Sequence, residues 1–403
     1  MRVLISGGGT GGHIYPAIAV AHQLQARYGA ELLYLGDVNG LETQLVPREG
    51  IPFAGITAGK LRRYLSPRVI SDLWRVPIGV RQAVRVVREF RPDAAFTSGG
   101  YVAVPAGIAA RMQRAPLLMH QQDVPPNLAN RLLKPLAARI SISFPHSLRY
   151  FPRGKTALLG NPVREEILRV AGVPAAQFKA EFGFDPTQPV LLVTGGSQGA
   201  WHLNQVIVRS LPELLPRCQV LHISGERTYE QTYELAEPYF MDRPEQRGRY
   251  VLRAYMATRM AEALAASDLV LCRSGAATLA ELALLGKPSV LVPLPPGFTG
   301  SPQAANAAMF RQAGAADLIL DRELTEKRLQ AVLIPLLETP ARRAIMTSAV
   351  RSFAHPAAAA DLADAVAALA ERRLRRRGQQ QPPAPPSEAD PAPASTASEG
   401  EAS

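Results

Sequence analysis

The chain opens with RVLISGGGTGGHIYPAIAV at residues 2–20, and this stretch decides the fold. Residues 2–6 have the apolar character of a short buried strand, and residues 7–12 form a glycine-rich turn. Pro16 stands in the first turns of the helix that should follow, where proline is tolerated. Such a turn lets the backbone approach a ligand, and the helix start behind it favours negative charge. The stretch therefore predicts an α/β unit with an anion-binding turn; a tight structural turn is the alternative.

Similar units follow along the chain and predict two parallel sheets. The first half holds strand-like segments at residues 31–35, 94–97 and 116–119, separated by helical patterns. After Gly160-Asn161-Pro162-Val163-Arg164 the order starts again, with strand-like segments at residues 189–194, 219–223, 268–272 and 289–292. Apolar strands that alternate with helices imply parallel sheets covered on both faces. We therefore expect the α/β class, with two doubly wound Rossmann-like domains and a cleft between them.

Four segments are expected from this pattern. Residues 1–162 form the N-terminal domain, and residues 163–345 form the C-terminal domain. Residues 346–370 form a helix that packs back toward the N-terminal domain. Residues 371–403 are a basic and then Pro/Ala-rich tail without aromatic residues, which we expect to be disordered because it cannot bury enough apolar surface.

Composition limits the classes of protein. With 403 residues, 47% of them hydrophobic, the chain can bury more than one core. Its only cysteines, Cys218 and Cys272, exclude a disulfide scaffold. We expect neither a signal peptide nor a transmembrane helix, because no apolar run is long enough.

The net charge of +11 is concentrated in the first half of the chain. Residues 1–162 carry 20 Lys and Arg against 8 Asp and Glu, whereas residues 163–370 carry 20 against 21. A basic half suits an anionic membrane surface or nucleic acid, and a merely soluble surface is the plain alternative. We expect no nucleic-acid partner, because stacking aromatic platforms and known binding modules are absent from the sequence.

Candidate site residues follow the predicted strands. His13 would lie at the mouth of the cleft, where a neutral imidazole can accept a proton. Ser197 lies in a second glycine turn, TGGSQGA, that suits a phosphate. Glu281 lies about two turns into the next helix, where a carboxylate can accept both ribose hydroxyls. Gln303 and Asn306 share a helix face and can bind sugar hydroxyls. A structural histidine, a solvated glutamate and surface amides are the alternatives.

Together these motifs resemble one family. GGGTGGHIYPAIAVA at the start, SGGYV at residues 98–102, GNPVR at 160–164, VTGGSQGA at 193–200 and CRSGAATLAE at 272–281 are similar to the signatures of the MurG family. Members of this family are UDP-N-acetylglucosamine–N-acetylmuramyl-(pentapeptide) pyrophosphoryl-undecaprenol N-acetylglucosamine transferases. The resemblance covers about residues 1–370 and rests on the order and spacing of the motifs.

The resemblance implies a GT-B fold and a hexosyltransferase. The reaction would be an inverting transfer of N-acetylglucosamine from UDP-N-acetylglucosamine to the muramyl 4-hydroxyl of undecaprenyl-pyrophosphoryl-MurNAc-pentapeptide, a step of peptidoglycan synthesis. The protein would work as a peripheral protein at the cytoplasmic face of the cell membrane, without a metal or another cofactor. A UDP-N-acetylglucosamine epimerase of GT-B fold is the alternative enzyme.

The resemblance also implies roles for single residues. His13 would be the catalytic base. The substrate-binding residues would be Thr10, Gly11, Gly12, Asp123, Arg164, Ser197, Ala257, Ala276, Glu281, Gln303 and Asn306. Further polar positions of the acceptor site or cleft would be Tyr101, His120, Asn130 and Asn204.

The sequence departs from the family pattern at two places. His120-Gln121-Gln122-Asp123 stands where the family usually has His-Glu-Gln-Asn, so a carboxylate is lost at Gln121 and an amide is replaced at Asp123. Pro302 stands where the family usually has a histidine.

Apolar, aromatic and Arg residues mix at residues 60–65 and 70–78, which predicts a membrane-contact patch; an ordinary core helix is the alternative.

Overall fold

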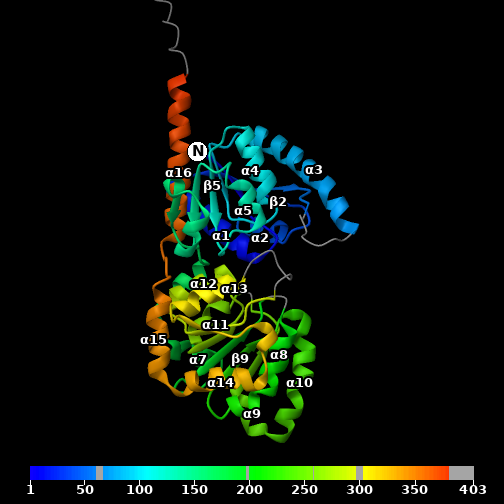
Figure 1. The fold of residues 1–403 in the computed structure, drawn as a ribbon, viewed down its shortest axis with the longest axis vertical. Helices are drawn as coiled ribbons and strands as arrows, with labels where there is room; N and C mark the ends of the chain where they lie inside the picture. The colour runs from blue at the N-terminus through cyan, green and yellow to red at the C-terminus, as the bar shows by residue number, and fades with distance from the viewer. Residues whose placement is uncertain (60–66, 197–198, 257, 296–302, 381–403) are drawn as a thin grey trace, which may run out of the picture.

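The computed structural model describes residues 1–59, 67–196, 199–256, 258–295 and 303–380. These residues form two α/β lobes stacked along the long axis of the molecule (Figure 1). Each lobe has one sheet of parallel strands, with seven strands in the N-terminal lobe and six in the C-terminal lobe within the described ranges. The predicted class of two doubly wound Rossmann-like domains is confirmed.

Both sheets have the same strand order. In the N-terminal lobe the order is β3 (Phe53–Ile56), β2 (Glu31–Asp37), β1 (Arg2–Ser6), β4 (Ala94–Thr97), β5 (Leu117–Gln121), β6 (Arg139–Ile142), β7 (Thr156–Leu158). In the C-terminal lobe the order is β10 (Tyr250–Arg253), β9 (Gln219–Ile223), β8 (Val190–Thr194), β11 (Leu269–Cys272), β12 (Ser289–Leu291), β13 (Ala316–Leu318). The order of winding reverses between β1 and β4 in one lobe and between β8 and β11 in the other. Ligands of doubly wound sheets bind at these reversal points, beyond the carboxyl ends of the strands.

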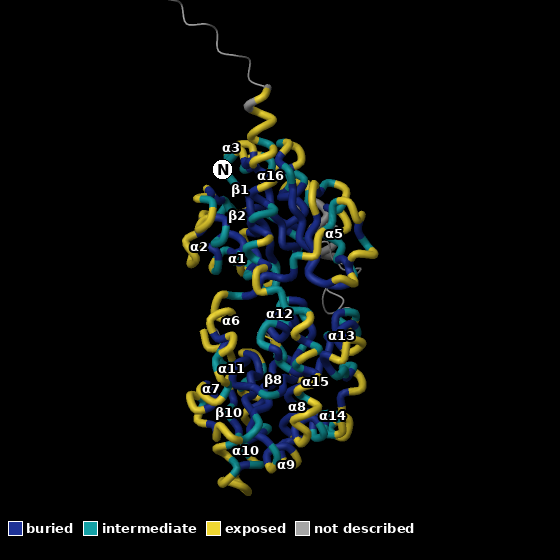
Figure 2. The backbone as a smooth tube through the Cα atoms, turned by 90° about the vertical axis from the view of Figure 1, so that its left-hand side faces the viewer, coloured by how far each residue is buried: buried dark blue, intermediate teal, exposed yellow. Residues whose placement is uncertain are grey.

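Alternate residues of each central strand point into two different cores, as expected for strands covered on both faces. In β1, Val3 and Ile5 pack into the core that contains α1 (Gly11–Tyr28), whereas Leu4 packs into the core that contains α4 (Ala103–Met112). In β8, Leu191 and Val193 share a core with α8 (Trp201–Arg209). Figure 2 shows the resulting pattern, with buried backbone inside each lobe and exposed residues on the outer helices.

The remaining helices surround these sheets and connect their strands. In the N-terminal lobe they are α2 (Glu42–Arg48), α3 (Pro67–Phe90) and α5 (Leu128–Leu133). In the C-terminal lobe they are α6 (Glu165–Val170), α7 (Ala175–Glu181), α9 (Leu211–Leu214), α10 (Tyr229–Asp242), α11 (Met260–Ala266), α12 (Ala276–Leu285), α13 (Gln303–Gln312), α14 (Glu326–Glu338) and α15 (Pro340–Arg351).

The last helix, α16 (Ala358–Gln380), returns to the N-terminal lobe and lies beside α1 (Figure 1). Leu362 and Val366 are buried in the core of that lobe. The sequence predicted disorder from residue 371, whereas the helix continues to Gln380. Arg373 explains part of this difference, because its guanidinium donates to the carbonyl oxygens of Pro92 at 2.8 Å and Gln113 at 2.7 Å. Residues 381–403 of the expected tail lie outside the described residues.

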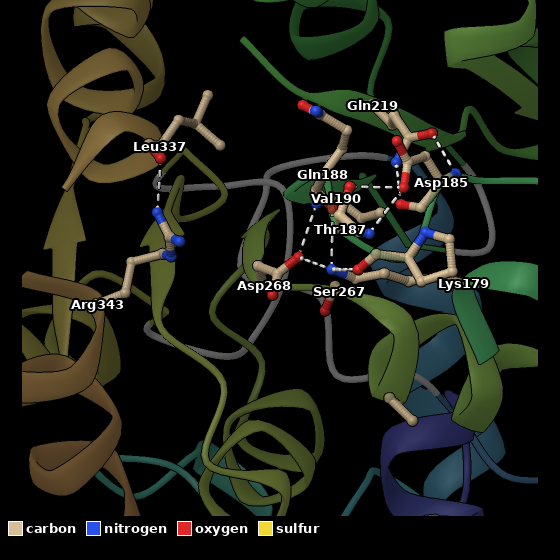
Figure 3. A network of polar contacts seen from close by, with 12 residues as sticks. Lys179, Asp185, Thr187, Gln188, Val190, Gln219, Ser267, Asp268, Leu337 and Arg343 are labelled. Carbon is tan, nitrogen blue, oxygen red and sulfur yellow. Dashed lines mark hydrogen bonds and ion pairs between the residues drawn. The ribbon is translucent and has the colours of Figure 1, made fainter. Parts of the chain in front are cut away.

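An ion pair between buried Lys179 and half-buried Asp268 lies at the amino edge of the C-terminal sheet (Figure 3). Lys179 Nζ lies 2.7 Å from Asp268 Oδ2, and the same oxygen accepts a hydrogen bond from the backbone N–H of Val190. Lys179 also donates to the carbonyl oxygen of Gln188 at 2.9 Å. The pair therefore ties α7 to β8 and to the start of β11, at the opposite edge of the sheet from the glycine turns.

Candidate active site

The glycine turns after β1 and β4 interlock in the N-terminal lobe. The backbone N–H of Gly8 donates to the carbonyl oxygen of Gly99 at 3.4 Å. A Cβ atom on Gly100, whose φ is +84°, would lie 2.1 Å from the Gly8 carbonyl oxygen. Ser98 Oγ donates to the carbonyl oxygen of His13 at 2.6 Å. The two turns therefore form one rigid unit, and glycine is required for their close approach.

His13 lies in the first turn of α1, and this unit fixes its protonation. Its Nδ1 lies 3.1 Å from the carbonyl oxygen of Ser98, which only accepts, so Nδ1 carries the hydrogen. The neutral ring then has an unprotonated Nε2. Burial lowers the pKa of His13, although Asp123 and Glu42 act in the opposite direction. The ring is therefore neutral at pH 7 and can accept a proton.

The other predicted residues of this turn have different exposures. Thr10 is the exposed N-cap residue of α1, and its side chain makes no capping hydrogen bond. Gly11 and Gly12 are half-buried residues of the first helical turn. The backbone N–H groups at this helix start can therefore meet an anion, and the anion site that the sequence indicates stays a prediction.

Glu42 stabilises the same turn through hydrogen bonds to backbone N–H groups, and the sequence did not predict this role. Its fully buried carboxylate accepts from the backbone N–H of Asp37 at 3.0 Å and from that of Gly9 at 3.4 Å. Tyr101, one of the predicted cleft residues, donates its hydroxyl to Asp37 Oδ2 at 2.6 Å and lies against Gly9. In the sequence, Glu42 has no distinguishing signal, because an acid near a helix start is common.

His120 and Asn130 lie in a buried network behind the site. His120 Nε2 lies 2.9 Å from Asn161 Oδ1, and its Nδ1 lies 3.1 Å from Ser141 Oγ. Burial lowers the pKa of His120 to about 4. Asn130 Nδ2 donates to the carbonyl oxygen of His120 and to Gln121 Oε1. His120 is fully buried and Asn130 almost so, and both bind protein groups in this structure. Their role in the acceptor site or cleft stays a prediction.

In the C-terminal lobe, the start of α12 has no side-chain cap. Gly275 is the N-cap residue and makes no side-chain cap, so the first backbone N–H groups, beginning at Ala276, can meet a ligand. Gln303 lies next to it, since Ser274 Oγ donates to the Gln303 carbonyl oxygen at 2.9 Å. Gln303 Oε1 accepts from the N–H of Leu294 at 3.1 Å, and its Nε2 points toward Gly275. Three other predicted or discussed positions, Ser197, Ala257 and Pro302, lie outside the described residues.

Arg164 and Glu281, two predicted donor ligands, form an ion pair. Arg164 Nε donates to Glu281 Oε1 at 2.9 Å, and both side chains are largely buried. Burial raises the pKa of Glu281, although Arg164 opposes this effect. The Arg164 guanidinium also lies over the ring of Tyr15, 5.7 Å from its centroid. Arg164 therefore connects Tyr15, in α1 of the N-terminal lobe, with Glu281, in α12 of the C-terminal lobe.

Asp123 and Asn306 also meet across the lobes. Asn306 Nδ2 donates to Asp123 Oδ1 at 2.8 Å and to the carbonyl oxygen of Ser274 at 3.1 Å. Asn306 Oδ1 accepts from the backbone N–H of Val124 at 2.8 Å. Asn306 is fully buried and its amide binds protein groups in this structure. That it binds sugar hydroxyls stays a prediction.

Asn204, another of the predicted cleft residues, lies in a buried polar network of the C-terminal lobe. It is fully buried in the C-terminal lobe, where its Nδ2 donates to the carbonyl oxygen of Ser224 at 2.9 Å and its Oδ1 lies 3.1 Å from His222 Nε2. It also contacts Thr228 Oγ1, and a Cβ atom on Gly199 would lie 2.3 Å from that hydroxyl. Asn204 thus supports the end of the second glycine turn from behind.

Two kinds of feature, a metal-binding cluster and a membrane-spanning helix, are absent from the described ranges. No group of three or more His, Cys, Asp or Glu side chains in those ranges is arranged to hold a metal ion. No helix in the same ranges combines the length and apolar character needed to cross a membrane.

Comparisons with known proteins agree with this architecture. Residues 3–142 match the glycosyltransferase family 28 N-terminal domain, and residues 190–364 match its C-terminal domain. The crystal structure of MurG from Acinetobacter baumannii superposes with a TM-score of 0.70 at 28% identity, covering 91% of this chain and 99% of that one. A UDP-GlcNAc 2-epimerase from Neisseria meningitidis reaches a TM-score of 0.63 at 15% identity, covering 91% and 100%, which shows a shared fold alone. Fold and site thus define a GT-B glycosyltransferase.

Curated relatives identify the family. A protein of Desulforudis audaxviator is 39% identical over 379 residues, 93% of this chain and 100% of its own length. A protein of Moorella thermoacetica is 40% identical over 363 residues, 89% of this chain and 96% of its own. Both carry the name UDP-N-acetylglucosamine–N-acetylmuramyl-(pentapeptide) pyrophosphoryl-undecaprenol N-acetylglucosamine transferase. The chain belongs to the MurG family.

Proposed function

We propose that the protein transfers N-acetylglucosamine from UDP-N-acetylglucosamine to the muramyl 4-hydroxyl of a polyprenyl-pyrophosphoryl MurNAc-pentapeptide, converting lipid I to lipid II. One observation carries the proposal: relatives named for this activity match nearly the whole sequence. The glycine-rich motifs of this chain also follow the strands at the reversal points of both sheets. Each lobe offers a helix start with backbone N–H groups for an anion, and Arg164 connects Glu281 of α12 with Tyr15 of α1.

The C-terminal lobe holds the donor in this proposal. The diphosphate lies at the start of α12, beside Ala276, and at the turn that contains Ser197. The Glu281 carboxylate accepts hydrogen bonds from the ribose hydroxyls, and the positive charge of Arg164 compensates the negative charge of Glu281. Gln303 binds the sugar with its Nε2, and the uracil lies near Ala257. The start of α1, with Thr10, Gly11 and Gly12, contributes backbone N–H groups to the phosphates of donor or acceptor.

Transfer proceeds with inversion. The acceptor oxygen forms a bond to the anomeric carbon as the bond from that carbon to the UDP oxygen breaks, and UDP leaves with the bonding electron pair. His13 Nε2 takes the proton of the hydroxyl, since Nδ1 is already occupied by the Ser98 carbonyl. The helix starts stabilise the negative charge that grows on the departing phosphate.

A transfer assay tests this function. Labelled N-acetylglucosamine from the UDP-sugar should appear on a synthetic polyprenyl-pyrophosphoryl muramyl-pentapeptide, with free UDP formed only when the acceptor is present. His13→Ala should lower kcat by about 100-fold or more and leave UDP-N-acetylglucosamine binding intact. Epimerised UDP-sugar without acceptor would instead support the epimerase alternative. Transfer by His13→Ala within a few-fold of the parent would refute the role of His13.

We further propose that the N-terminal lobe binds an anionic membrane surface at the cytoplasmic face, through α3. Arg81, Arg85 and Arg88 are exposed on this helix and line a shallow groove with Ile78, which is 49% exposed. Arg and exposed apolar residues on one helix suit the headgroup region of a bilayer. The expected stretch at residues 60–65 lies outside the described residues, and these exposed side chains lie in the middle and second half of α3.

Flotation with vesicles tests the membrane contact. Vesicles that contain phosphatidylglycerol should carry the protein upward at low salt, and phosphatidylcholine vesicles should not. Charge reversal of Arg81, Arg85 and Arg88 to Glu should abolish flotation. The matched control reverses three exposed C-terminal residues, Arg322, Lys327 and Arg328, and should float like the parent. Equal loss in both variants would refute a site on α3, because net charge alone would then explain binding.

A further inference from the structure

The loop after β5 carries a buried carboxylate, Asp123, and is linked to the His13 ring through the carbonyl oxygen of Ser98. Asp123 is only 4% exposed. Gln122, its neighbour, donates Nε2 to the carbonyl oxygen of Ser98 at 2.9 Å, and His13 Nδ1 donates to that same oxygen. Gln121 Nε2 donates to the Asp123 carbonyl oxygen at 2.6 Å, which fixes the loop from its other side. The shared carbonyl brings this loop and the imidazole into one small volume.

Asn306 holds this carboxylate from the opposite lobe. Both polar atoms of its amide are used: Nδ2 donates to Asp123 Oδ1, and Oδ1 accepts from the N–H of Val124, each at 2.8 Å. Nδ2 also donates to Ser274, directly before the helix start assigned to the donor phosphates. A charge-assisted hydrogen bond in a buried site is strong and directional. The position of Asp123 therefore depends on where the C-terminal lobe sits.

Three titratable side chains influence His13, and they differ in what each can do. Glu42 is committed to two backbone N–H groups beneath the turn, and Ser98, Gln122 and Gly99 add no charge. His120 is neutral, since burial holds its pKa at about 4. Asp123 contributes most to raising the pKa of His13. When His13 accepts the proton, a buried imidazolium forms, and a nearby carboxylate compensates that charge.

We propose that Asp123 is a positioning residue that sets the basicity of His13, and that Asn306 holds it there only while the two lobes are in contact. Proton acceptance is then coupled to the joining of the lobes around the donor. The inference rests on the proposed function and deepens it. It gives a role to the Gln121 and Asp123 departures: the carboxylate absent at position 121 is supplied two residues later, from a loop that the other lobe fixes.

Two substitutions separate charge from placement. Asp123→Asn keeps an oxygen that accepts from Asn306 and removes the charge. Asn306→Ala keeps the charge and removes the link to the other lobe. Asp123→Glu restores the charge, and Glu166→Gln, at an exposed position beside Arg164, is the matched control. Melting temperatures identify any variant that fails to fold, and Asp123→Glu then carries the comparison with the parent.

The readouts are the titration of His13 by NMR of the full chain labelled in histidine, assigned with His13→Gln, and the pH profile of transfer. Asp123→Asn should lower the His13 pKa by about one unit. The acid limb of kcat should move to lower pH by the same amount, kcat should fall roughly tenfold at the optimum, and the KM for UDP-N-acetylglucosamine should stay within about threefold. Asn306→Ala should shift both in the same direction by less, and Glu166→Gln should shift neither.

The outcomes distinguish this inference from the proposed function. An unchanged His13 titration in Asp123→Asn overturns the inference, whatever the activity. A shifted titration with an unshifted pH profile supports the placement of Asp123 and overturns His13 as the base. Rescue of the parental profile by Asp123→Glu, but not by Asp123→Asn, supports a role for the charge, because a merely structural role would not move the profile.

Discussion

At the scale of single residues, burial decides which polar side chains are free for substrate. Glu281 and Arg164 were each expected to bind the donor, yet in the structure each is the other's partner at 2.9 Å. A buried carboxylate without a partner costs several kcal/mol, so the ion pair with Arg164 stabilises the charged form of Glu281 before any ligand arrives. A ribose diol then has only to add hydrogen bonds to a carboxylate that Arg164 already holds.

Glu281→Ala should raise the KM for UDP-N-acetylglucosamine by roughly 10- to 100-fold, because hydrogen bonds to a charged group contribute about 1.5–3 kcal/mol. It should also lower the free energy of unfolding, since Arg164 loses its partner inside the protein. Steady-state kinetics and denaturant unfolding measure the two effects. Glu166→Gln is the control, and a KM unchanged in Glu281→Ala would contradict the ribose assignment.

Gly100 and Gly29 offer a matched test of the interlocked turns. Both have positive φ, +84° and +55°, but a Cβ atom meets the Gly8 carbonyl oxygen at 2.1 Å in one case and nothing within 4 Å in the other. Gly29→Ala should cost about 1 kcal/mol of stability. Gly100→Ala should cost more than about 3 kcal/mol or abolish transfer, as measured by unfolding and the transfer assay. Equal costs would mean that backbone strain alone matters there.

At the scale of elements, the sequence predicted what depends on local pattern. The strands at residues 2–6 and 94–97 were placed as the structure has them, because a buried parallel strand is a short apolar run that ends in glycine. The networks around His120 and Asn204 were not predictable, since their partners lie 18–41 residues away along the chain. Neither was the length of α16: its arginine cluster resembles a solvated tail until Pro92 and Gln113 supply carbonyl oxygens.

Arg373→Ala should destabilise the N-terminal lobe by about 1–3 kcal/mol, because two partly buried carbonyl oxygens lose a charged donor. Arg376→Ala removes an exposed arginine three residues later on the same helix and should change stability by less than about 0.5 kcal/mol. Denaturant unfolding of the full chain compares them. Identical unfolding curves for the two variants would show that the part of α16 after residue 371 does not contribute to the stability of the lobe.

At the scale of the whole molecule, each lobe contains a fully buried histidine that folding keeps neutral. Burial lowers the pKa of His120 to about 4 in the N-terminal lobe and that of His222 to about 3 in the C-terminal lobe. His222 Nδ1 lies 2.8 Å from the Tyr250 hydroxyl, and its Nε2 faces Asn204 Oδ1. The unfolded chain binds a proton at each histidine below about pH 6.5, whereas the folded chain does not.

The free energy of unfolding should therefore be fully retained above about pH 6.5 and fall as the pH drops toward 4, by up to about 1.4 kcal/mol per pH unit for each histidine. The sign follows because the unfolded state binds more protons in this window, so stability rises with pH. Denaturant unfolding between pH 7 and 5 measures the slope. His120→Gln and His222→Gln should each reduce it by about one histidine's share, while His146→Gln, at an exposed position, should leave it unchanged. A slope that both buried variants leave intact would mean that carboxylates, rather than these histidines, govern acid unfolding of the two lobes.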